Sequence, residues 1–279
     1  MTTHHKLLEN ALDALGLPEA LVACALGRTS PAVFNLEAPA RWYVFPPALI
    51  PLWSDGSWPT YIGYWKHWFV EREPCFVKMY VGSGLMTVEI ARTCEQLMGV
   101  LAMMSISLED GVTPQLERFA TTVGLDCLDA LDAQSLKTGD DPQGFVNVDL
   151  FKTLTPLQSM ADGSSAYTGD FPAPANLNLN RKWWETSCSF EIVDQPLCLP
   201  ADAELPAWFA ADVEKKPLFD DFMAAGRLDY AWLTLNSTGW SIADARQALV
   251  ALQAQAGDED FDQVVAYWLS VADLDAGGY

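Results

Sequence analysis

Acidic residues outnumber basic residues by more than two to one in this chain, although half of its residues are hydrophobic. The 279 residues include 37 Asp and Glu against 16 Lys and Arg, which gives a net charge of −21. Acidic chains that stay disordered lack apolar residues, whereas this sequence contains 11 Trp, 13 Phe and 8 Tyr. We therefore predict a folded, strongly anionic protein, which repels nucleic acid and anionic lipid and attracts cationic surfaces.

The chain length, the apolar runs and the cysteine spacing limit the number of domains and the cellular compartment. A length of 279 residues allows one large domain or two ordinary ones. No apolar run approaches the roughly 20 residues of a membrane-spanning helix, and the N-terminus lacks a basic region followed by a long apolar stretch. We therefore predict a cytoplasmic protein with no signal peptide and no membrane partner. The six cysteines show no C-x-x-C spacing and are expected to be reduced thiols in the core.

The first half of the chain alternates between helical and extended patterns. Apolar residues at helical spacing predict helices over 5–16, 18–26 and 91–104. Aromatic and β-branched runs predict strands at 42–45, 50–53, 61–70, 75–81 and 85–90. A Gly-Ser-Gly sequence separates the last two runs and predicts a hairpin turn. This order predicts an α+β fold, in which a small antiparallel or mixed sheet packs with helices.

The second half is mostly helical in pattern and is interrupted by a segment rich in Gly, Ser, Pro and Asn. Helices are expected at 114–123, 125–135, 149–160, 241–256 and 261–272. The predicted organisation is an α+β domain over 1–136, a linker or long loop over 137–180, and a mainly helical C-terminal region over 181–279. This last region could pack on the first domain.

The charge is unevenly distributed along the sequence. Residues 41–82 carry four basic and three acidic residues, a net charge of +1. Residues 106–170 carry three basic and eleven acidic residues, and residues 201–279 carry four and fourteen, so these segments have net charges of −8 and −10. Acidic helix faces can simply keep a protein soluble. Self-repulsion at this charge lowers stability, however, and a cationic partner would relieve it.

Aromatic residues are densest between positions 53 and 69. The aromatic cluster consists of Trp53, Trp58, Tyr61, Trp65 and Trp68. If exposed, such a cluster could stack on sugars or bases, or anchor a protein interface. Alternation along 61–69 places aromatic residues on both faces of a strand, so we favour a core that is covered on both sides. Base stacking is disfavoured because nucleic-acid binders need a positively charged surface.

No pattern of catalytic or metal-binding residues stands out. His67 is the only histidine outside the N-terminus and is expected to be an ordinary core or surface residue. Phosphate-loop, dinucleotide and nucleophile-elbow motifs are missing, and the cysteines and histidines lack zinc spacing. The run Asp258–Asp262 lacks the glycine and final glutamate of a helical calcium loop, and predicts an acidic first turn of the last helix. We expect no catalytic residue, metal or cofactor.

One stretch carries a family resemblance. Residues 45–56 read FPPALIPLWSDG, and residues 61–65 read YIGYW. After the predicted hairpin, a helix opens with an A-x-T-x-E-x-L pattern on Ala91, Thr93, Glu95 and Leu97. This order of an Ile-Pro element, a polar turn, a sheet and a helix resembles the SUKH superfamily of bacterial toxin-immunity proteins. The resemblance covers roughly residues 5–105, and it implies a protein that neutralises toxins, often nucleases, without catalytic residues of its own.

These observations favour an acidic immunity protein that binds a cationic bacterial toxin domain, such as a nuclease, and blocks its active site. Electrostatic steering would speed its capture, and a few aromatic anchors would supply affinity. The contact is expected on the acidic helical regions, at Asp140, Asp141, Asp258, Glu259, Asp260 and Asp262. One alternative is a carbohydrate-binding or carbohydrate-processing protein that uses the aromatic cluster. Another is an adaptor in a larger assembly.

Overall fold

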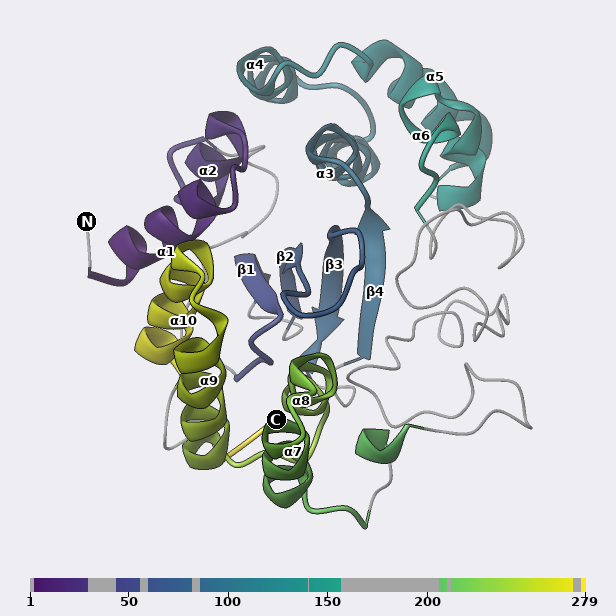
Figure 1. The fold of residues 1–279 in the computed structure, drawn as a ribbon. Helices are drawn as coiled ribbons and strands as arrows, with labels where there is room; N and C mark the ends of the chain where they lie inside the picture. The colour runs from purple at the N-terminus through teal and green to yellow at the C-terminus, as the bar shows by residue number, and fades with distance from the viewer. Residues whose placement is uncertain are drawn as a thin grey trace.

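A four-stranded antiparallel sheet lies between two groups of helices (Figure 1). The structure is a computed structural model, which describes residues 3–29, 44–55, 60–81, 86–139, 141–156, 206–209, 212–272 and 277–279. Helices α3 to α6 gather beyond one end of the strands, and α7 and α8 lie beyond the other end. The predicted α+β class, with a mainly helical C-terminal region, is confirmed.

The sheet is a meander in which each strand pairs with the next one along the chain. Its strands are β1 (Leu49–Asp55), β2 (Thr60–Trp65), β3 (Cys75–Tyr80) and β4 (Met86–Ala91). The pairing of β3 with β4 confirms the predicted hairpin, although its Gly-Ser-Gly turn lies outside the described residues. The strand predicted at 42–45 is not formed at Val44 and Phe45, which lead into β1 as irregular chain. Their side chains are buried instead, so the apolar pattern there reflects burial and not a strand.

A bulge in β1 decides which face of the sheet Trp53 occupies. The register shifts between Pro51, which pairs with Gly63, and Trp53, which pairs with Ile62. Without the extra residue, Trp53 would lie on the same face as Pro51, because side chains alternate along a strand. The shift instead directs the indole of Trp53 towards α2 (Glu19–Ala25), where its Nε1 donates a hydrogen bond of 3.2 Å to the carbonyl of Cys24.

The first group of helices gathers around α3 (Cys94–Glu109). It comprises α2, α4 (Pro114–Val123), α5 (Leu128–Thr138), a 3₁₀ helix (Pro142–Asn147) and α6 (Asp149–Lys152). Helix α1 (Thr3–Ala14) precedes α2 and packs against the last helix of the chain. Thr93 and Thr113 cap α3 and α4 by accepting hydrogen bonds from backbone N–H groups of the first turn. Part of the predicted linker is therefore packed structure, because Phe145 and Phe151 after α5 are buried. The rest of that segment, from residue 157, lies outside the described residues.

The second group contains the last helices of the chain. After a short 3₁₀ helix (Ala207–Phe209), it comprises α7 (Lys215–Ala224), α8 (Leu228–Leu235), α9 (Ile242–Ala256) and α10 (Glu259–Val271). The predicted cap is present, since the Ser241 hydroxyl accepts from the N–H of Asp244. Gly257 ends α9 in the left-handed conformation with a φ of 58°, where a residue without a Cβ is favoured.

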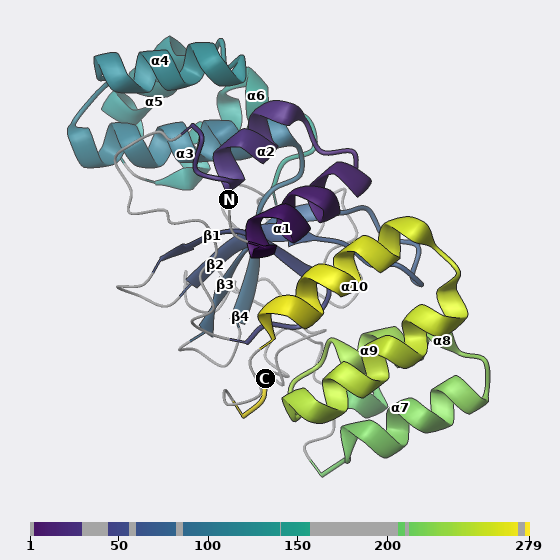
Figure 2. The ribbon, with the colours of Figure 1, turned by 90° about the vertical axis from the view of Figure 1, so that its left-hand side faces the viewer.

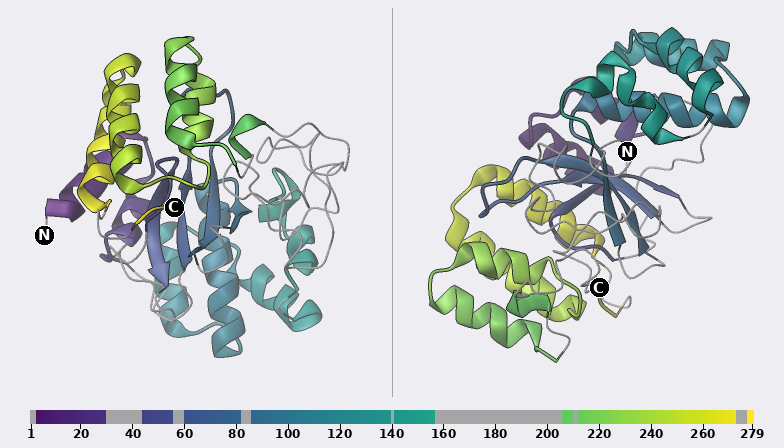
Figure 3. Two further views of the ribbon diagram at one scale, coloured as in Figure 1. Left: turned by 90° about the horizontal axis from the view of Figure 1, so that it is seen from below. Right: turned by 90° about the vertical axis from the view of Figure 1, so that its right-hand side faces the viewer.

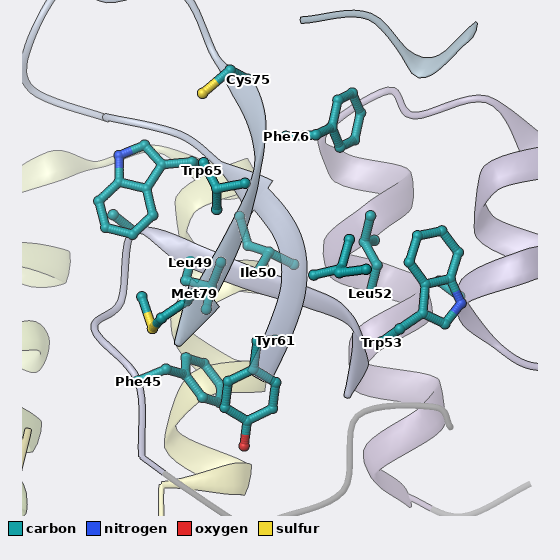
Figure 4. Close-up of a cluster of buried hydrophobic side chains, with 14 of the residues drawn as sticks. Phe45, Leu49, Ile50, Leu52, Trp53, Tyr61, Trp65, Cys75, Phe76 and Met79 are labelled. Atoms are coloured by element: carbon teal, nitrogen blue, oxygen red, sulfur yellow. The ribbon is translucent and has the colours of Figure 1, made fainter. Parts of the chain in front are cut away.

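A single large hydrophobic cluster joins the N-terminal sheet to the C-terminal helices. Helix α1 packs along α10, and Figure 2 shows these two helices side by side although they lie at opposite ends of the chain. The Trp268 indole on α10 donates to the carbonyl of Phe45 at 2.9 Å. The side chains of Phe45 and Tyr61 meet edge to face in this cluster (Figure 4). Residues from the predicted first and third segments therefore share one core.

Candidate partner-binding surface

Most of the predicted aromatic cluster is buried in the core. The exposed fractions of Trp53, Tyr61 and Trp65 are 3%, 1% and 1%, whereas Trp58 lies outside the described residues. Figure 4 shows Tyr61, Trp65 and Trp53 among aliphatic side chains of β1 and β3. Alternation along β2 correctly indicated that both faces of this strand are covered. These three side chains therefore offer no exposed aromatic face on which a sugar could stack.

Trp68 differs from the other members because it is only half-buried and lies against the C-terminal helices. Its ring centroid is 5.1 Å from that of Phe261, in the first turn of α10. The Nζ atom of Lys66 lies 4.0 Å from the centre of the Trp68 ring, within range of a cation–π interaction. The loop after β2 thus brings one aromatic and one basic side chain to the start of α10.

The acidic first turn of α10 is formed as predicted. Asp258 is the N-cap, and its carboxylate accepts from the N–H groups of Asp260 and Phe261 at 2.9 and 3.0 Å. Asp258, Glu259 and Asp260 are exposed, while half-buried Asp262 accepts a hydrogen bond of 2.9 Å from the amide of Gln253. Carboxylates at this position also interact favourably with the helix dipole. We call these four residues, with the neighbouring Lys66 and Trp68, the C-terminal acidic surface.

Lys66 is the basic side chain placed beside these carboxylates. Partial burial lowers the pKa of its ammonium group, and the nearby charges of Asp258 and Asp260 oppose that lowering. Lys66 forms no ion pair with a described residue, because its amine stacks on Trp68 instead. The C-terminal acidic surface thus carries one positive and four negative charges, so it stays anionic. Sequence reasoning missed Lys66, since no local signal places residue 66 beside residue 258.

The predicted contact residues do not form one surface. Asp141 is exposed and follows α5, and the teal segment that contains α5 lies well apart from yellow α10 in both views of Figure 3. Helix α5 packs on α3, whereas α10 packs on α1 and α9. Asp140 lies outside the described residues. The acidic residues at 140–141 and 258–262 were grouped by charge alone, and the fold separates Asp141 from the cluster at 258–262.

The basic residues of the C-terminal region are all bonded to groups of the same chain. Residues 201–279 contain four, namely Lys215, Lys216, Arg227 and Arg246. Lys216 and Arg227 form ion pairs with Asp220 and Asp229. Buried Lys215 donates to the carbonyl of Trp208, and Arg246 donates to the carbonyl of Leu269 at 2.7 Å, at the end of α10. In contrast, Asp258, Glu259 and Asp260 form no ion pair with any described residue.

His67 is buried between two indoles and is not placed for catalysis. Its ring nitrogens Nε2 and Nδ1 each lie 3.1 Å from an indole nitrogen, those of Trp65 and Trp232. A neutral imidazole accepts at one nitrogen only, so only one of the two indoles donates in a given tautomer. Burial, with a smaller effect from the charge of Arg72, lowers the pKa of His67 to about 3. His67 is therefore a neutral core residue, as one of the expected alternatives proposed.

The cysteines of the described residues are free thiols. Cys24 and Cys75 are buried, and Cys94 and Cys127 are half-buried. Burial raises the pKa of the Cys24, Cys94 and Cys127 thiols, so they are protonated and weakly nucleophilic at neutral pH. No group of three or more Cys, His, Asp and Glu side chains among the described residues is arranged to hold a metal ion.

Two adjoining pockets lie at the N-terminal end of α3, and sequence reasoning gave no signal for them. The first has a volume of about 270 Å³ and lies between α2, α3 and the end of α4; its lining is Pro18, Ala20, Leu21, Cys94, Glu95, Met98, Val123, Gly124 and Leu125. The second has a volume of about 390 Å³ and lies between α3 and α6; its lining is Thr93, Glu95, Gln96, Asp126, Cys127, Asp149, Leu150, Thr153 and Leu154. We call them the apolar pocket and the acidic pocket. Glu95 lines both.

Comparisons with known proteins give no relative. No protein-family model, curated protein or solved structure matches this chain. None of the helices in the described ranges has the length and apolar character needed to cross a membrane.

Proposed function

We propose that this protein binds a cationic protein partner and blocks its active site, as an immunity protein does for a bacterial toxin domain. The observation that carries the proposal is a difference between basic and acidic side chains in the C-terminal region: the basic ones have bonding partners in the chain, and three exposed acidic ones have no ion-pair partner among the described residues. There each of the four basic side chains is bonded to another group of the same chain, while the carboxylates of Asp258, Glu259 and Asp260 are exposed and form no ion pair with a described residue. A surface with this imbalance attracts a cationic partner and raises its association rate.

The chemistry of the C-terminal acidic surface suits such a contact. Exposed carboxylates accept charge-assisted hydrogen bonds from Lys and Arg side chains, which are stronger than neutral ones. Half-buried Trp68 adds an aromatic side chain next to them, and tryptophan is enriched among the residues that dominate binding energy. The family resemblance of residues 5–105 supports a toxin as the partner, and a nuclease would have the basic active-site cleft that such a surface could cover.

The proposal is tested by co-expression with the product of the neighbouring gene, which the proposal expects to be a cationic toxin. A bacterial host producing that product alone should stop growing, and co-production of this protein should restore growth. The triple variant Asp258→Asn, Glu259→Gln and Asp260→Asn should restore growth less well, since it removes three charges while Asn keeps the N-cap. The control variant Glu109→Gln, Asp110→Asn and Asp129→Asn removes three exposed charges at the far end of α3 and on α5, and should protect like the native protein. Failure of the native protein to protect would reject the proposal.

A further inference from the structure

The two pockets at the N-terminal end of α3 differ in chemistry but adjoin each other. Neighbouring residues of α3, and neighbouring residues of the segment that faces it, line one pocket and then the other. Cys94 lines the apolar pocket and Glu95 lines both. On the facing segment, Leu125 lines the apolar pocket and the next residue, Asp126, lines the acidic one. A ligand that fills one pocket therefore lies directly beside the other.

We infer that these pockets together bind a short segment of a cationic protein, with an apolar side chain in one and a Lys or Arg side chain in the other. This inference rests on the proposed function and names a contact for it that the sequence did not suggest. It places the contact on α2, α3, α4 and α6, away from the C-terminal acidic surface (Figure 1).

The apolar pocket is lined mainly by aliphatic side chains. Buried Leu21, Met98 and Leu125 line it, together with half-buried Val123. Removal of a Leu or Met side chain of a partner from water into such a lining is favourable, because apolar surface leaves water. Met98 also makes the pocket adaptable, since its unbranched side chain can adjust to different apolar shapes.

The acidic pocket concentrates negative charge. Glu95, Asp126 and Asp149 line it. Burial raises the pKa of the Cys127 thiol, and the negative charges of Glu95 and Asp126 raise it further, so both carboxylates lie close to this thiol. Lys152 forms an ion pair with Asp149, whereas Glu95 and Asp126 form none with a described residue. Two carboxylates thus remain for a guanidinium or ammonium group, which makes charge-assisted hydrogen bonds with such acceptors.

The walls of the acidic pocket are held in place by Gln96. Its amide Nε2 donates to the carbonyls of Leu150, Thr153 and Leu154 at 3.1, 3.2 and 3.1 Å, which joins α3 to the end of α6. Its Oε1 accepts from the N–H of Arg92 at 2.9 Å. A site whose walls are fixed before binding loses less conformational entropy when a ligand enters.

The pocket inference is tested with capped tripeptides and the intact protein. Side chains two residues apart lie on one face of an extended peptide, so acetyl-Leu-Gly-Arg-amide presents both groups. Acetyl-Leu-Gly-Glu-amide lacks the positive charge, and acetyl-Gly-Gly-Arg-amide lacks the apolar group. Methionine methyl NMR reports on the apolar pocket, with the Met98 signal assigned through a Met98→Leu variant. We expect the first peptide to shift the Met98 signal with a dissociation constant of about 1 mM, and the other two to bind at least about tenfold more weakly.

Two variants and one control separate the two halves of the site. Ala20→Phe should fill the apolar pocket and abolish the Met98 response, and Glu95→Gln should weaken binding of the Arg peptide about fivefold or more. Glu117→Gln removes the same charge from the exposed face of α4 and should leave binding unchanged. The inference is overturned by equal affinity for the Arg and Glu peptides, by no shift at about 10 mM peptide, or by equal effects of Glu95→Gln and Glu117→Gln.

The same variants distinguish this inference from the proposed function. If the native protein and Glu95→Gln both neutralise the toxin while the peptides fail to bind, the pockets are rejected and the proposed function stands. If the Arg peptide binds as expected while the native protein gives no protection, the pockets bind cationic segments but the immunity function is rejected.

Discussion

The two sides of α10 show how differently its residues contribute to stability and to binding. On the inner side, Phe261 packs against Trp68, Phe69 and Trp232, with ring centroids 5.1 to 5.8 Å apart. On the outer side, within the same turn, Glu259 and Asp260 are exposed and unpaired with described residues. The inner residues join the sheet to the C-terminal helices. The outer carboxylates gain from the helix dipole and repel each other, so on balance they contribute little to folding and stay available for the proposed cationic partner.

The largest stability effect should come from the inner side. Trp232 is fully buried and contacts Phe69, Phe261 and His67. Trp232→Ala should lower the free energy of unfolding by about 3–5 kcal/mol, because it removes a large side chain and leaves a cavity. Urea denaturation followed by circular dichroism measures this change, with the conservative Trp232→Phe as the control for lost volume. A loss below about 1 kcal/mol would mean that this interface does not hold the helices on the sheet.

The next largest effect is a dependence of the free energy of unfolding on pH, which arises from the titration of His67. Its folded-state pKa is lowered to about 3, whereas an unfolded histidine has a pKa of about 6.5. The stability from keeping the imidazole neutral is therefore present above about pH 6.5 and is lost as the pH falls towards 3. Between pH 7 and pH 5 the native protein should lose about 2 kcal/mol more than His67→Gln, which does not titrate. Parallel losses in the two proteins, by urea denaturation at both pH values, would contradict a buried neutral His67.

A smaller loss of stability is expected when the N-cap of α10 is removed. Asp258→Ala removes the N-cap of α10 and should lower the free energy of unfolding by about 1 kcal/mol. Asp258→Asn keeps an oxygen acceptor at this position and should lose about half of that or less. Thermal denaturation compares the two variants directly. Equal losses would assign the effect to the charge of Asp258 and not to its hydrogen bonds.

The smallest stability effect should come from the exposed carboxylates. Glu259→Gln and Asp260→Asn should each change the free energy of unfolding by no more than about 0.5 kcal/mol, since the lost helix-dipole interaction is offset by reduced repulsion. Urea denaturation at low salt measures this change. A loss of more than about 2 kcal/mol would give these residues a structural role and would sharply weaken the case for a binding role.

Local patterns predicted most of the elements. The Gly-Ser-Gly sequence indicated the hairpin of β3 and β4, Ser241 indicated the start of α9, and the acids at 258–262 indicated the first turn of α10. These signals are contained within a few residues, where turn and capping preferences act. The apolar pattern at 42–45 failed because burial alone, without strand pairing, explains its described residues Val44 and Phe45.

The site depended on contacts that no local pattern encodes. His67 meets Trp232 across 165 positions, and Trp68 meets Phe261 across an even longer separation. Lys66 joins the acidic carboxylates of α10 only through this packing. The pockets around Glu95 likewise need α2, α3, α4 and α6 to be placed first. Charge counting identified the acidic residues, but only the fold separates Asp141 from Asp258.

The salt dependence of association tests the binding role of the outer side most directly. The rate constant for association with a toxin that this protein neutralises in the co-expression test would be measured by stopped-flow fluorescence at about 50 mM and about 500 mM NaCl, since added salt screens exposed charges. For the native protein it should fall at least about tenfold at the higher salt. The Asp258→Asn, Glu259→Gln and Asp260→Asn variant should associate more slowly at low salt and respond less to added salt. Equal rate constants for the two proteins at both concentrations would contradict a partner-binding role for the start of α10.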